Sequence, residues 1–347
     1  MSKLRLGTRG SLLAMAQANS LKGRLAELHP DLEVEIVTIK TSGDRGQREQ
    51  IGAFVHEIQL AELDDRVDVG LHCLKDIPTE PVQGLTFAAY LAREDPRDTI
   101  ITRGPIWTDL PPGSVIGTGS VRRTSQLASM ASRPAQLLGG RLLPKPSLPE
   151  NLSLDRFMTV VATNSTRWVG NPPAFEFKPL LGNVDTRLRK LIEGEYDAIV
   201  LAIAGLKRLG VLDRWAETDY RDLRVEPLGA DVMLPAPGQA VLVLEAREDA
   251  AETRELLKPL HDDATERAST AERAFLKAFG GGCSVPVAAW AEVNGADIDL
   301  QGLVAAPDGS HVLRGQTIGS STDIGERLAQ ELIAQGAMDL FASGVSR

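Results

Sequence analysis

Two short turns rich in glycine and hydroxyl groups each precede a segment with helical spacing. They are residues 7–11 (GTRGS) and 117–120 (GTGS). Backbone N–H groups at a helix start attract anions, and the hydroxyls of Ser11, Thr118 and Ser120 would add further donors. Simple serine capping of the helix is the alternative for either turn taken alone. The spacing of a phosphate-binding P-loop is absent from both.

Arginines follow the second of these turns and two later ones. Arg122 and Arg123 follow residues 117–120 after a single valine, Val121. This favours a carboxylate or phosphate partner, because the planar fork of arginine fits such groups in a bidentate way. Arg187 and Arg208 also follow apparent turns. Each alone is typical of a solvated surface charge, whereas a shared cleft would gather all of them around a polyanionic ligand.

Two further side chains are candidates for chemistry. Asp76 follows the strand-like run 67–72, and ligands of open α/β sheets bind beyond the carboxyl ends of strands. It is therefore a candidate catalytic carboxylate, with an ion pair or a helix cap as the alternative. Cys283 is preceded by three glycines. A thiol in such a turn is a candidate nucleophile or attachment point, unlike the usual buried cysteine.

The elements that position these residues alternate between strand and helix, which predicts a mostly parallel sheet covered by helices. The expected strands are residues 3–7, 32–41 and 67–72, and the expected helices run from Ser11 to before Pro30 and over 54–63.

Two pairs of segments resemble each other and suggest a second lobe of the same kind. Residues 114–123 repeat the strand, turn and helix arrangement of residues 4–11, and 196–201 repeat 66–71. Two similar α/β lobes facing one cleft would produce this pattern, although chance could produce echoes this short.

The remaining segments divide the chain further. The polar run 93–98 is expected to cross between the lobes, and the proline-punctuated segment 132–173 is interpreted as a long irregular insertion. From about residue 266 the pattern indicates a separate α+β unit, with helices over 269–279 and near 323–336.

Composition excludes several classes of protein. The net charge of −9 argues against a general nucleic-acid binder. The longest apolar run, 198–206, is too short to span a membrane, and the start lacks the apolar core of a signal peptide, so a cytoplasmic location is expected. Two cysteines build no disulfide framework, and without a Cys/His pair at ligand spacing no metal site is expected.

Eight motifs in one order resemble those of the porphobilinogen deaminases, also called hydroxymethylbilane synthases. The resemblance covers nearly the whole chain except about residues 132–173. The motifs are GTRGS (7–11), HCLKDIPT (72–79), REDPRD (93–98), GTGSVRR (117–123), GNVDTR (182–187), AGLKRLG (204–210), PAPGQ (235–239) and GGCSVP (281–286).

The resemblance implies an α/β fold with two lobes like those of type II periplasmic binding proteins and a small C-terminal α+β domain. We expect residues 1–92 and 239–258 to form the first lobe and residues 97–235 the second, including the insertion. Residues 262–347 would form the C-terminal domain that carries Cys283.

The resemblance also implies a transferase of tetrapyrrole (haem) biosynthesis, acting as a cytoplasmic monomer. Cys283 would hold one dipyrromethane cofactor through a thioether, and four porphobilinogen units would be added to give hydroxymethylbilane and ammonia. Asp76 would stabilise the positive charge that develops on pyrrole nitrogen. The pyrrole carboxylates would pair with Arg9, Ser11, Lys75, Thr118, Ser120, Arg122, Arg123, Arg187 and Arg208.

Some positions depart from the family pattern. Leu181 stands where an arginine usually precedes Gly-Asn, residues 50–54 lack the usual lysine of a loop expected to move near 41–52, and Ala240 replaces a glycine. A missing arginine removes a charge-assisted hydrogen bond, each worth about 1.5–3 kcal/mol. The alternatives are therefore a diverged, catalytically impaired relative or a two-lobed module that binds small anions.

Overall fold

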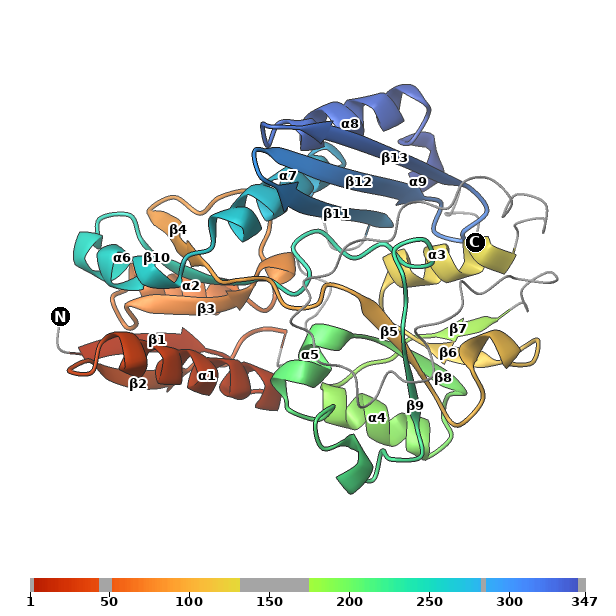
Figure 1. Cartoon of the computed structure of the whole chain (residues 1–347), viewed down its shortest axis with the longest axis horizontal. Helices are drawn as coiled ribbons and strands as arrows, with labels where there is room; N and C mark the ends of the chain where they lie inside the picture. Colours follow the sequence, from red (N-terminus) through yellow and green to blue (C-terminus); the bar gives the residue numbers. More distant parts are fainter. Residues whose placement is uncertain (1–2, 44–51, 132–174, 282–284, 343–347) are drawn as a thin grey trace.

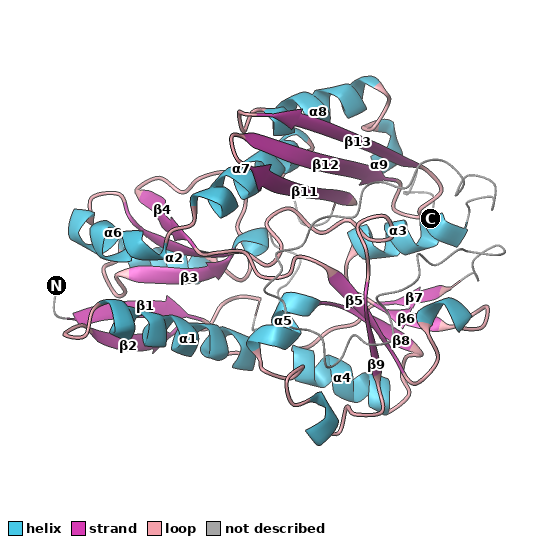
Figure 2. Ribbon diagram, in the orientation of Figure 1, coloured by secondary structure: helices cyan, strands magenta, loops and turns pink. Residues whose placement is uncertain are grey.

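The computed structural model describes residues 3–43, 52–131, 175–281 and 285–342. Within these ranges the strands form two five-stranded sheets and one three-stranded sheet, which lie in separate parts of the molecule (Figures 1 and 2). The expected insertion at 132–173, Cys283 and most of the loop expected to move lie outside the described residues.

The first lobe contains a mixed sheet in which β1 is parallel to both β2 and β3, whereas β10 is antiparallel to β3 and β4. In sheet order its strands are β2 (Glu33–Thr38), β1 (Lys3–Thr8), β3 (Val69–Cys73), β10 (Leu242–Arg247) and β4 (Leu85–Tyr90). Its helices are α1 (Leu12–Leu28), α2 (His56–Leu63) and α6 (Ala251–Leu257), with the short 3₁₀ helices η1 (Leu74–Asp76) and η5 (Lys258–Leu260).

Helix α1 shows why this lobe folds as the sequence predicts. Ser11 caps it, since its Oγ accepts a hydrogen bond from the backbone N–H of Ala14 at 3.2 Å. Leu21 and Leu25 lie one turn apart on the buried face. They pack with Leu4 and Leu6 of β1 in one apolar cluster, which fixes the helix against the sheet.

The second lobe contains a sheet of the same type, in which β6 is parallel to β7 and β8, and β5 is antiparallel to β8 and β9. In sheet order its strands are β7 (Glu176–Lys178), β6 (Val115–Gly117), β8 (Ala198–Ala202), β5 (Asp98–Thr102) and β9 (Arg224–Pro227). Its helices are α3 (Val121–Ala131), α4 (Val184–Ile192) and α5 (Ile203–Arg208), with the 3₁₀ helices η2 (Trp107–Asp109) and η4 (Trp215–Glu217).

The two sheets therefore have equivalent strands, as the repeated sequence segments suggested. Strand β6 corresponds to β1, and β8 corresponds to β3. The chain passes from the first sheet to the second between β4 and β5, and it returns between β9 and β10 (Figure 1). The lobes also touch directly, because α5 of the second lobe lies against α1 of the first (Figure 1).

The C-terminal unit packs two helices on an antiparallel sheet in the order β11-β12-β13. Its elements are α7 (Asp263–Ala278), β11 (Val287–Asn294), β12 (Asp297–Ala305), β13 (Val312–Gly319), α8 (Ile324–Ala334) and α9 (Asp339–Ala342). Helix α7 begins six residues before the predicted start, because the Asp262 side chain accepts from the backbone N–H of Thr265 at 2.7 Å and caps it. The predicted α/β fold class is thus confirmed, but the expectation of a mostly parallel sheet is wrong. Each five-stranded sheet is mixed, because the chain crosses between the lobes and adds antiparallel strands to both sheets.

Candidate functional site

Asp76 lies at the end of η1, directly beyond strand β3, and is half-buried. The loop that follows is held by the C-terminal unit. Arg273 of α7 donates through Nη1 to the carbonyl oxygen of Ile77 at 2.9 Å and through Nη2 to that of Pro78 at 2.7 Å. The carboxylate is therefore positioned by a sheet strand on one side and by a helix of another unit on the other.

The segment that leads to Cys283 approaches the same loop. Cys283 lies outside the described residues, but Gly281 is described and has a φ of +69°. A Cβ on Gly281 would collide with Oγ1 of Thr79, three residues after Asp76. Glycine is needed here both for the positive φ and for the close approach. The chain therefore passes the Asp76 loop two residues before Cys283.

Lys75 connects the turn at Asp76 to the segment between β9 and β10, where the chain returns from the second lobe to the first. Its Nζ donates to Oε1 of Gln239 at 3.2 Å. Gln239 is buried, and its Nε2 donates to the carbonyl oxygen of Pro96 at 2.7 Å and to Oδ1 of Asp98 at 3.1 Å. Burial lowers the pKa of Lys75, while the Asp76 carboxylate acts in the opposite direction. The side-chain amide of Gln239 thus links Lys75 of the first lobe to Asp98 at the start of β5.

Arg122 and Arg123 are buried and bind the protein's own carboxylate. Arg122 Nη2 lies 2.8 Å from Asp98 Oδ2, and Arg123 Nη2 lies 2.7 Å from Oδ1. Arg122 also donates to the carbonyl oxygen of Leu234 at 2.7 Å, and Arg123 to that of Val200 at 2.8 Å. The structure places both arginines around Asp98, and their binding of a ligand's carboxylates stays a prediction.

The pKa of Asp98 follows from these neighbours. Burial raises it, but the charges of Arg122, Arg123 and Lys75 outweigh burial and lower the pKa to about 2. The carboxylate is therefore ionised at neutral pH. Asp98 and Gln239 belong to motifs noted in the sequence, but the sequence alone assigned no role to either residue. Their position at the two crossings between the lobes could have marked them as residues that connect the lobes.

The hydroxyl groups of Ser11 and Thr118 each accept a hydrogen bond from a backbone N–H within or just after their turn. Thr118 is buried, and its Oγ1 accepts from the backbone N–H of Ser120 at 3.2 Å. The Ser120 carbonyl accepts from the backbone N–H groups of Arg123 and Thr124. The Ser11 cap agrees with the capping alternative at the first turn. Serine capping at the second turn and anion binding at either turn stay predictions.

The other predicted cations have separate surroundings. The Arg9 guanidinium lies 4.2 Å from the centroid of the Phe54 ring, and Arg187 Nε donates to the carbonyl oxygen of Gly182 at 2.8 Å. Arg208 Nη2 donates to the carbonyl oxygen of Ala240 at 2.6 Å, next to Gln239. Burial lowers the pKa of Arg208. The contacts above join Lys75, Arg122 and Arg123 through Gln239 and Asp98, and bring Arg208 beside them.

Two departures from the family pattern have structural consequences. Leu181 is 57% exposed at the turn before α4, where it offers no charge to a ligand. Ala240 has a φ of +68°, a left-handed conformation that glycine adopts at lower cost. The family's usual glycine at this position therefore fits the backbone found here.

No helix among the described residues is both long enough and apolar enough to cross a membrane.

Comparison with protein families matches both parts of the chain. Residues 4–137 and 149–255 match the model described as "Porphobilinogen deaminase, dipyromethane cofactor binding domain", and residues 267–334 match that family's C-terminal domain. Two similar relatives are named porphobilinogen deaminase. The one from Acidithiobacillus ferrooxidans is 39% identical and covers 97% of each chain, and the one from Nitrosomonas europaea is 37% identical and covers 98% of each.

Solved structures with a related arrangement include the methionine-binding protein MetQ and the periplasmic aliphatic sulphonate-binding protein SsuA of Escherichia coli. MetQ is 14% identical with a TM-score of 0.39, over 76% of this chain and 92% of that one. SsuA is 13% identical with a TM-score of 0.35, over 75% and 69%. The family matches and the curated relatives span nearly the whole sequence. The chain belongs to the porphobilinogen deaminases, a family of transferases, and includes that family's dipyrromethane cofactor-binding domain.

Proposed function

We propose that the chain joins four porphobilinogen molecules on a dipyrromethane primer linked to Cys283, and releases hydroxymethylbilane and ammonia. The observation that carries this proposal is the packing of Gly281 against Thr79, which brings the segment before Cys283 to the Asp76 loop. Arg273 holds the same loop from the C-terminal unit. A tether and a catalytic carboxylate on these two segments would share one space.

The residues present fit a cofactor that carries carboxylates. A pyrrole chain with acetate and propionate groups needs cations from more than one direction. Lys75 comes from the first lobe, Arg122 and Arg123 come from the second, and Arg208 approaches the returning crossing segment. When bound, the dipyrromethane supplies the pyrrole position to which the first substrate unit is joined. The same cations would bind the carboxylates of each added unit.

The role that we assign to Asp76 follows from its charge and position. Loss of ammonia from porphobilinogen leaves positive charge on the pyrrole nitrogen. A carboxylate that accepts a hydrogen bond from the pyrrole N–H stabilises this charge as it develops. Lys75, the preceding residue, is turned toward Gln239 by its hydrogen bond. We infer that Lys75 orients the turn while Asp76 faces the substrate.

The role of Arg122 and Arg123 is compatible with their contacts to Asp98. A guanidinium carries five N–H donors. The contacts of Arg122 described above use two of them, and Arg123 uses three, since its Nε also donates to Asp98 Oδ1 at 3.0 Å. We infer that Asp98 fixes the planes of both guanidinium groups and that their other N–H groups bind the carboxylates of the pyrrole chain. We also propose the lobe boundaries given by the sequence, 1–92 with 239–258 and 97–235.

The cofactor prediction is tested by intact mass. The purified parent chain should carry an added mass equal to one dipyrromethane, and Cys283→Ser should carry none. Brief incubation with porphobilinogen should then add mass in steps of one pyrrole unit to the parent only. Cys73→Ser is the matched control, because Cys73 lies at the end of β3 and should leave the adduct in place. An adduct that persists in Cys283→Ser would refute the attachment site.

The catalytic prediction concerns Asp76→Asn. We expect this variant to keep the fold and the covalent cofactor but to lose about 100-fold or more in kcat, the size typical of removing one group that stabilises transition-state charge. Ammonia release and thermal unfolding measure the two effects separately. Glu80→Gln, on the exposed side of the same loop, is the control and should retain turnover. Full activity of Asp76→Asn would contradict the role assigned to Asp76.

Leu181 supports the alternative of an impaired relative, since it places an exposed apolar side chain where the family usually has an arginine. The same two assays distinguish the alternatives. An impaired relative would hold little cofactor and release no ammonia.

A further inference from the structure

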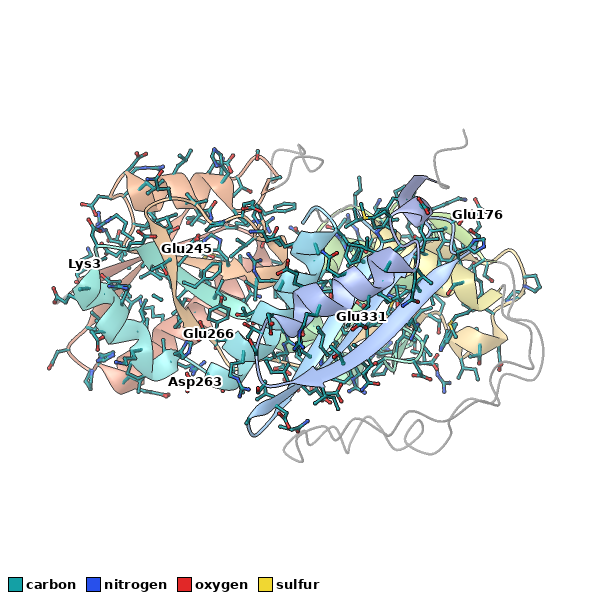
Figure 3. All side chains as sticks on the ribbon, turned by 90° about the horizontal axis from the view of Figure 1, so that it is seen from above. Lys3, Glu176, Glu245, Asp263, Glu266 and Glu331 are labelled. Carbon is teal, nitrogen blue, oxygen red and sulfur yellow. The ribbon has the colours of Figure 1, made fainter. Side chains whose placement is uncertain are left out.

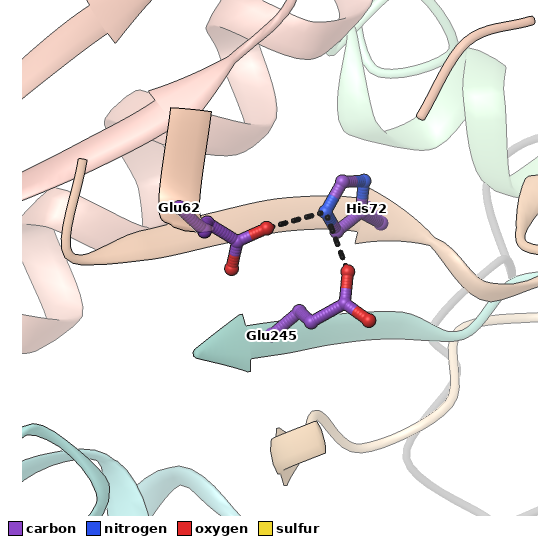
Figure 4. Close-up of side chains that lie close together, drawn as sticks. All are labelled: Glu62, His72 and Glu245. Carbon is purple, nitrogen blue, oxygen red and sulfur yellow. Dashed lines mark ion pairs between the residues drawn. The ribbon is translucent and has the colours of Figure 1, made fainter. Parts of the chain in front are cut away.

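A group of three buried side chains in the first lobe lies apart from the site described above. Glu62 comes from α2, His72 from β3 and Glu245 from β10 (Figure 4). His72 Nε2 lies 3.4 Å from Glu245 Oε2 and 3.8 Å from Glu62 Oε2. The exposed fraction of each side chain is 5% or less. We call this group the lobe-1 triad.

The triad holds polar atoms that have no hydrogen-bond partner among the described residues. These atoms are Nε2 of His72 and Oε2 of Glu62, which face one another. A buried polar atom without a partner is costly, so each such atom requires an explanation. Because both atoms can donate an electron pair to a cation, a bound cation would satisfy the two at once.

The spacing of the donor atoms suits a small divalent ion. One ligand atom from each of the three residues lies within 4.8 Å of the others. Zinc bonds to histidine nitrogen and carboxylate oxygen at about 2.0–2.1 Å in a tetrahedron. This geometry places ligand atoms roughly 3.3–3.4 Å apart. The distances of 3.4 and 3.8 Å from His72 Nε2 to the two carboxylates are close to this separation.

Gly70 keeps the space beside these donors open. A Cβ at this position would lie 2.6 Å from His72 Nε2 and 2.8 Å from Glu62 Oε2. Any other residue would therefore place a carbon atom directly against two of the three donor groups. The glycine occurs in β3, in the middle of a buried sheet, where its missing side chain would otherwise weaken packing.

Other contacts fix the carboxylates in the orientation that a metal requires. Glu62 accepts from the backbone N–H of Gly70 at 3.1 Å through Oε1, which leaves Oε2 directed at His72. Glu245 accepts from Nε2 of Gln59 at 3.0 and 3.3 Å. Supporting hydrogen bonds of this kind orient ligands at metal sites.

We propose that the lobe-1 triad binds one divalent transition-metal ion, best satisfied by zinc, which ties α2 to β3 and β10. Two carboxylates and a neutral imidazole balance the charge of the ion, and water would complete the tetrahedron. The sequence predicted no metal, because these ligands come from three separated elements and not from closely spaced Cys/His pairs. The inference does not depend on the proposed function.

The test loads metal during folding, since the site is buried. Denatured, metal-free full-length chain is refolded with zinc or with a chelator, and loosely held ions are then removed by gel filtration. We expect about one zinc per chain by elemental analysis, and a melting temperature several degrees higher than that of the chelator sample. Cobalt in place of zinc should give the intense visible absorption of a tetrahedral site.

Two variants remove binding without removing the fold. Glu62→Gln keeps the side-chain shape but takes away a charged ligand, and Gly70→Ala fills the open space while keeping all three ligands. Both should lose the bound zinc, the melting shift and the cobalt spectrum, with unchanged circular dichroism of the metal-free chain. His72→Gln should behave in the same way.

The matched control is the other described group with similar spacing, His261, Asp263 and Glu266. Its acids are 92% and 47% exposed, and Figure 3 labels both of them as well as the buried Glu245. His261→Gln should leave zinc binding unchanged. The proposal is overturned if the refolded parent holds no zinc, if Glu62→Gln and Gly70→Ala hold as much as the parent, or if His261→Gln alone abolishes binding.

Discussion

Two buried groups of charged side chains in this molecule respond to burial in opposite ways. Asp98 has an exposed side-chain fraction of 0%, yet Arg122 and Arg123 lower its pKa to about 2. Glu62 is equally buried, but burial raises its pKa to about 8, against the weaker effects of the Gly70 N–H and Arg247. Burial also raises the pKa of Glu245 to about 7, opposed by His72.

The difference shows that the charge of a buried carboxyl group depends on the cations beside it. Asp98 has two guanidinium groups within 2.8 Å. In the lobe-1 triad two carboxyl groups share one imidazole whose own pKa is lowered by burial. The negative charge of Asp98 is balanced by the two arginines alone. The negative charge of the lobe-1 triad is balanced only when a proton or an added cation is bound.

The largest effect is expected from Asp98→Asn. Removing the carboxylate leaves two buried guanidinium groups without their counter-charge, and loss of one partner of a buried ion pair costs about 3–5 kcal/mol. Urea denaturation at pH 7 should show this decrease in the free energy of unfolding. The control is Asp323→Asn, whose exposed partner Arg327 lies 3.6 Å away, and it should cost less than about 1 kcal/mol. Equal losses in both variants would remove the contrast between buried and exposed pairs.

The second effect is the pH dependence of the metal-free chain. The pKa of Glu62 rises from 4.5 unfolded to about 8 folded, so the folded chain keeps a proton that the unfolded chain releases. The contribution of Glu62 to stability is therefore fully present below its unfolded pKa and is lost as pH rises towards 8, by an amount on the order of a few kcal/mol. We expect the urea concentration at the midpoint of unfolding, measured with a chelator present, to decrease as the pH is raised from 6.5 to 8.5.

Glu62→Gln cannot lose this proton, so its stability should change much less over that range. The comparison is made above pH 6.5, because the lowered pKa of His72 gives the opposite slope at more acidic pH. Arg247, Arg273 and Asp76 also act on the triad and are retained in the variant. Glu331→Gln on the exposed face of α8 should keep the slope of the parent. A parent and Glu62→Gln with identical slopes would show that Glu62 is not the group that titrates.

The smallest effect is expected from Gln59→Leu. This change removes the amide that donates to both oxygens of Glu245. The loss should be about 1–2 kcal/mol at pH 8, where Glu245 is ionised, and smaller at pH 5.5, where it is protonated. Unfolding curves at the two pH values measure the difference. A loss that is the same at both would show that Gln59 contributes packing and not a charge-assisted hydrogen bond.

Local sequence was sufficient for the elements that border the quoted motifs. The helix start at Ser11 followed from its capping side chain and the apolar spacing behind it. The equivalence of β1 with β6, and of β3 with β8, followed from repeated segments. Helix α7 was predicted too short because the cap at Asp262 precedes the apolar pattern.

The sequence also determined the family, the cofactor and the residues worth testing, because short motifs and their order along the chain can be recognised without a three-dimensional structure. It could not show that Asp98 binds Arg122 and Arg123, since β5 and α3 meet only when the second lobe folds. Nor could it bring Glu245 to Glu62 and His72, because Glu245 is far from both in the chain and the three meet only where α2 and β10 pack against β3. Which charges oppose one another in a low-dielectric interior depends on distances of a few ångströms, and only the tertiary structure sets those.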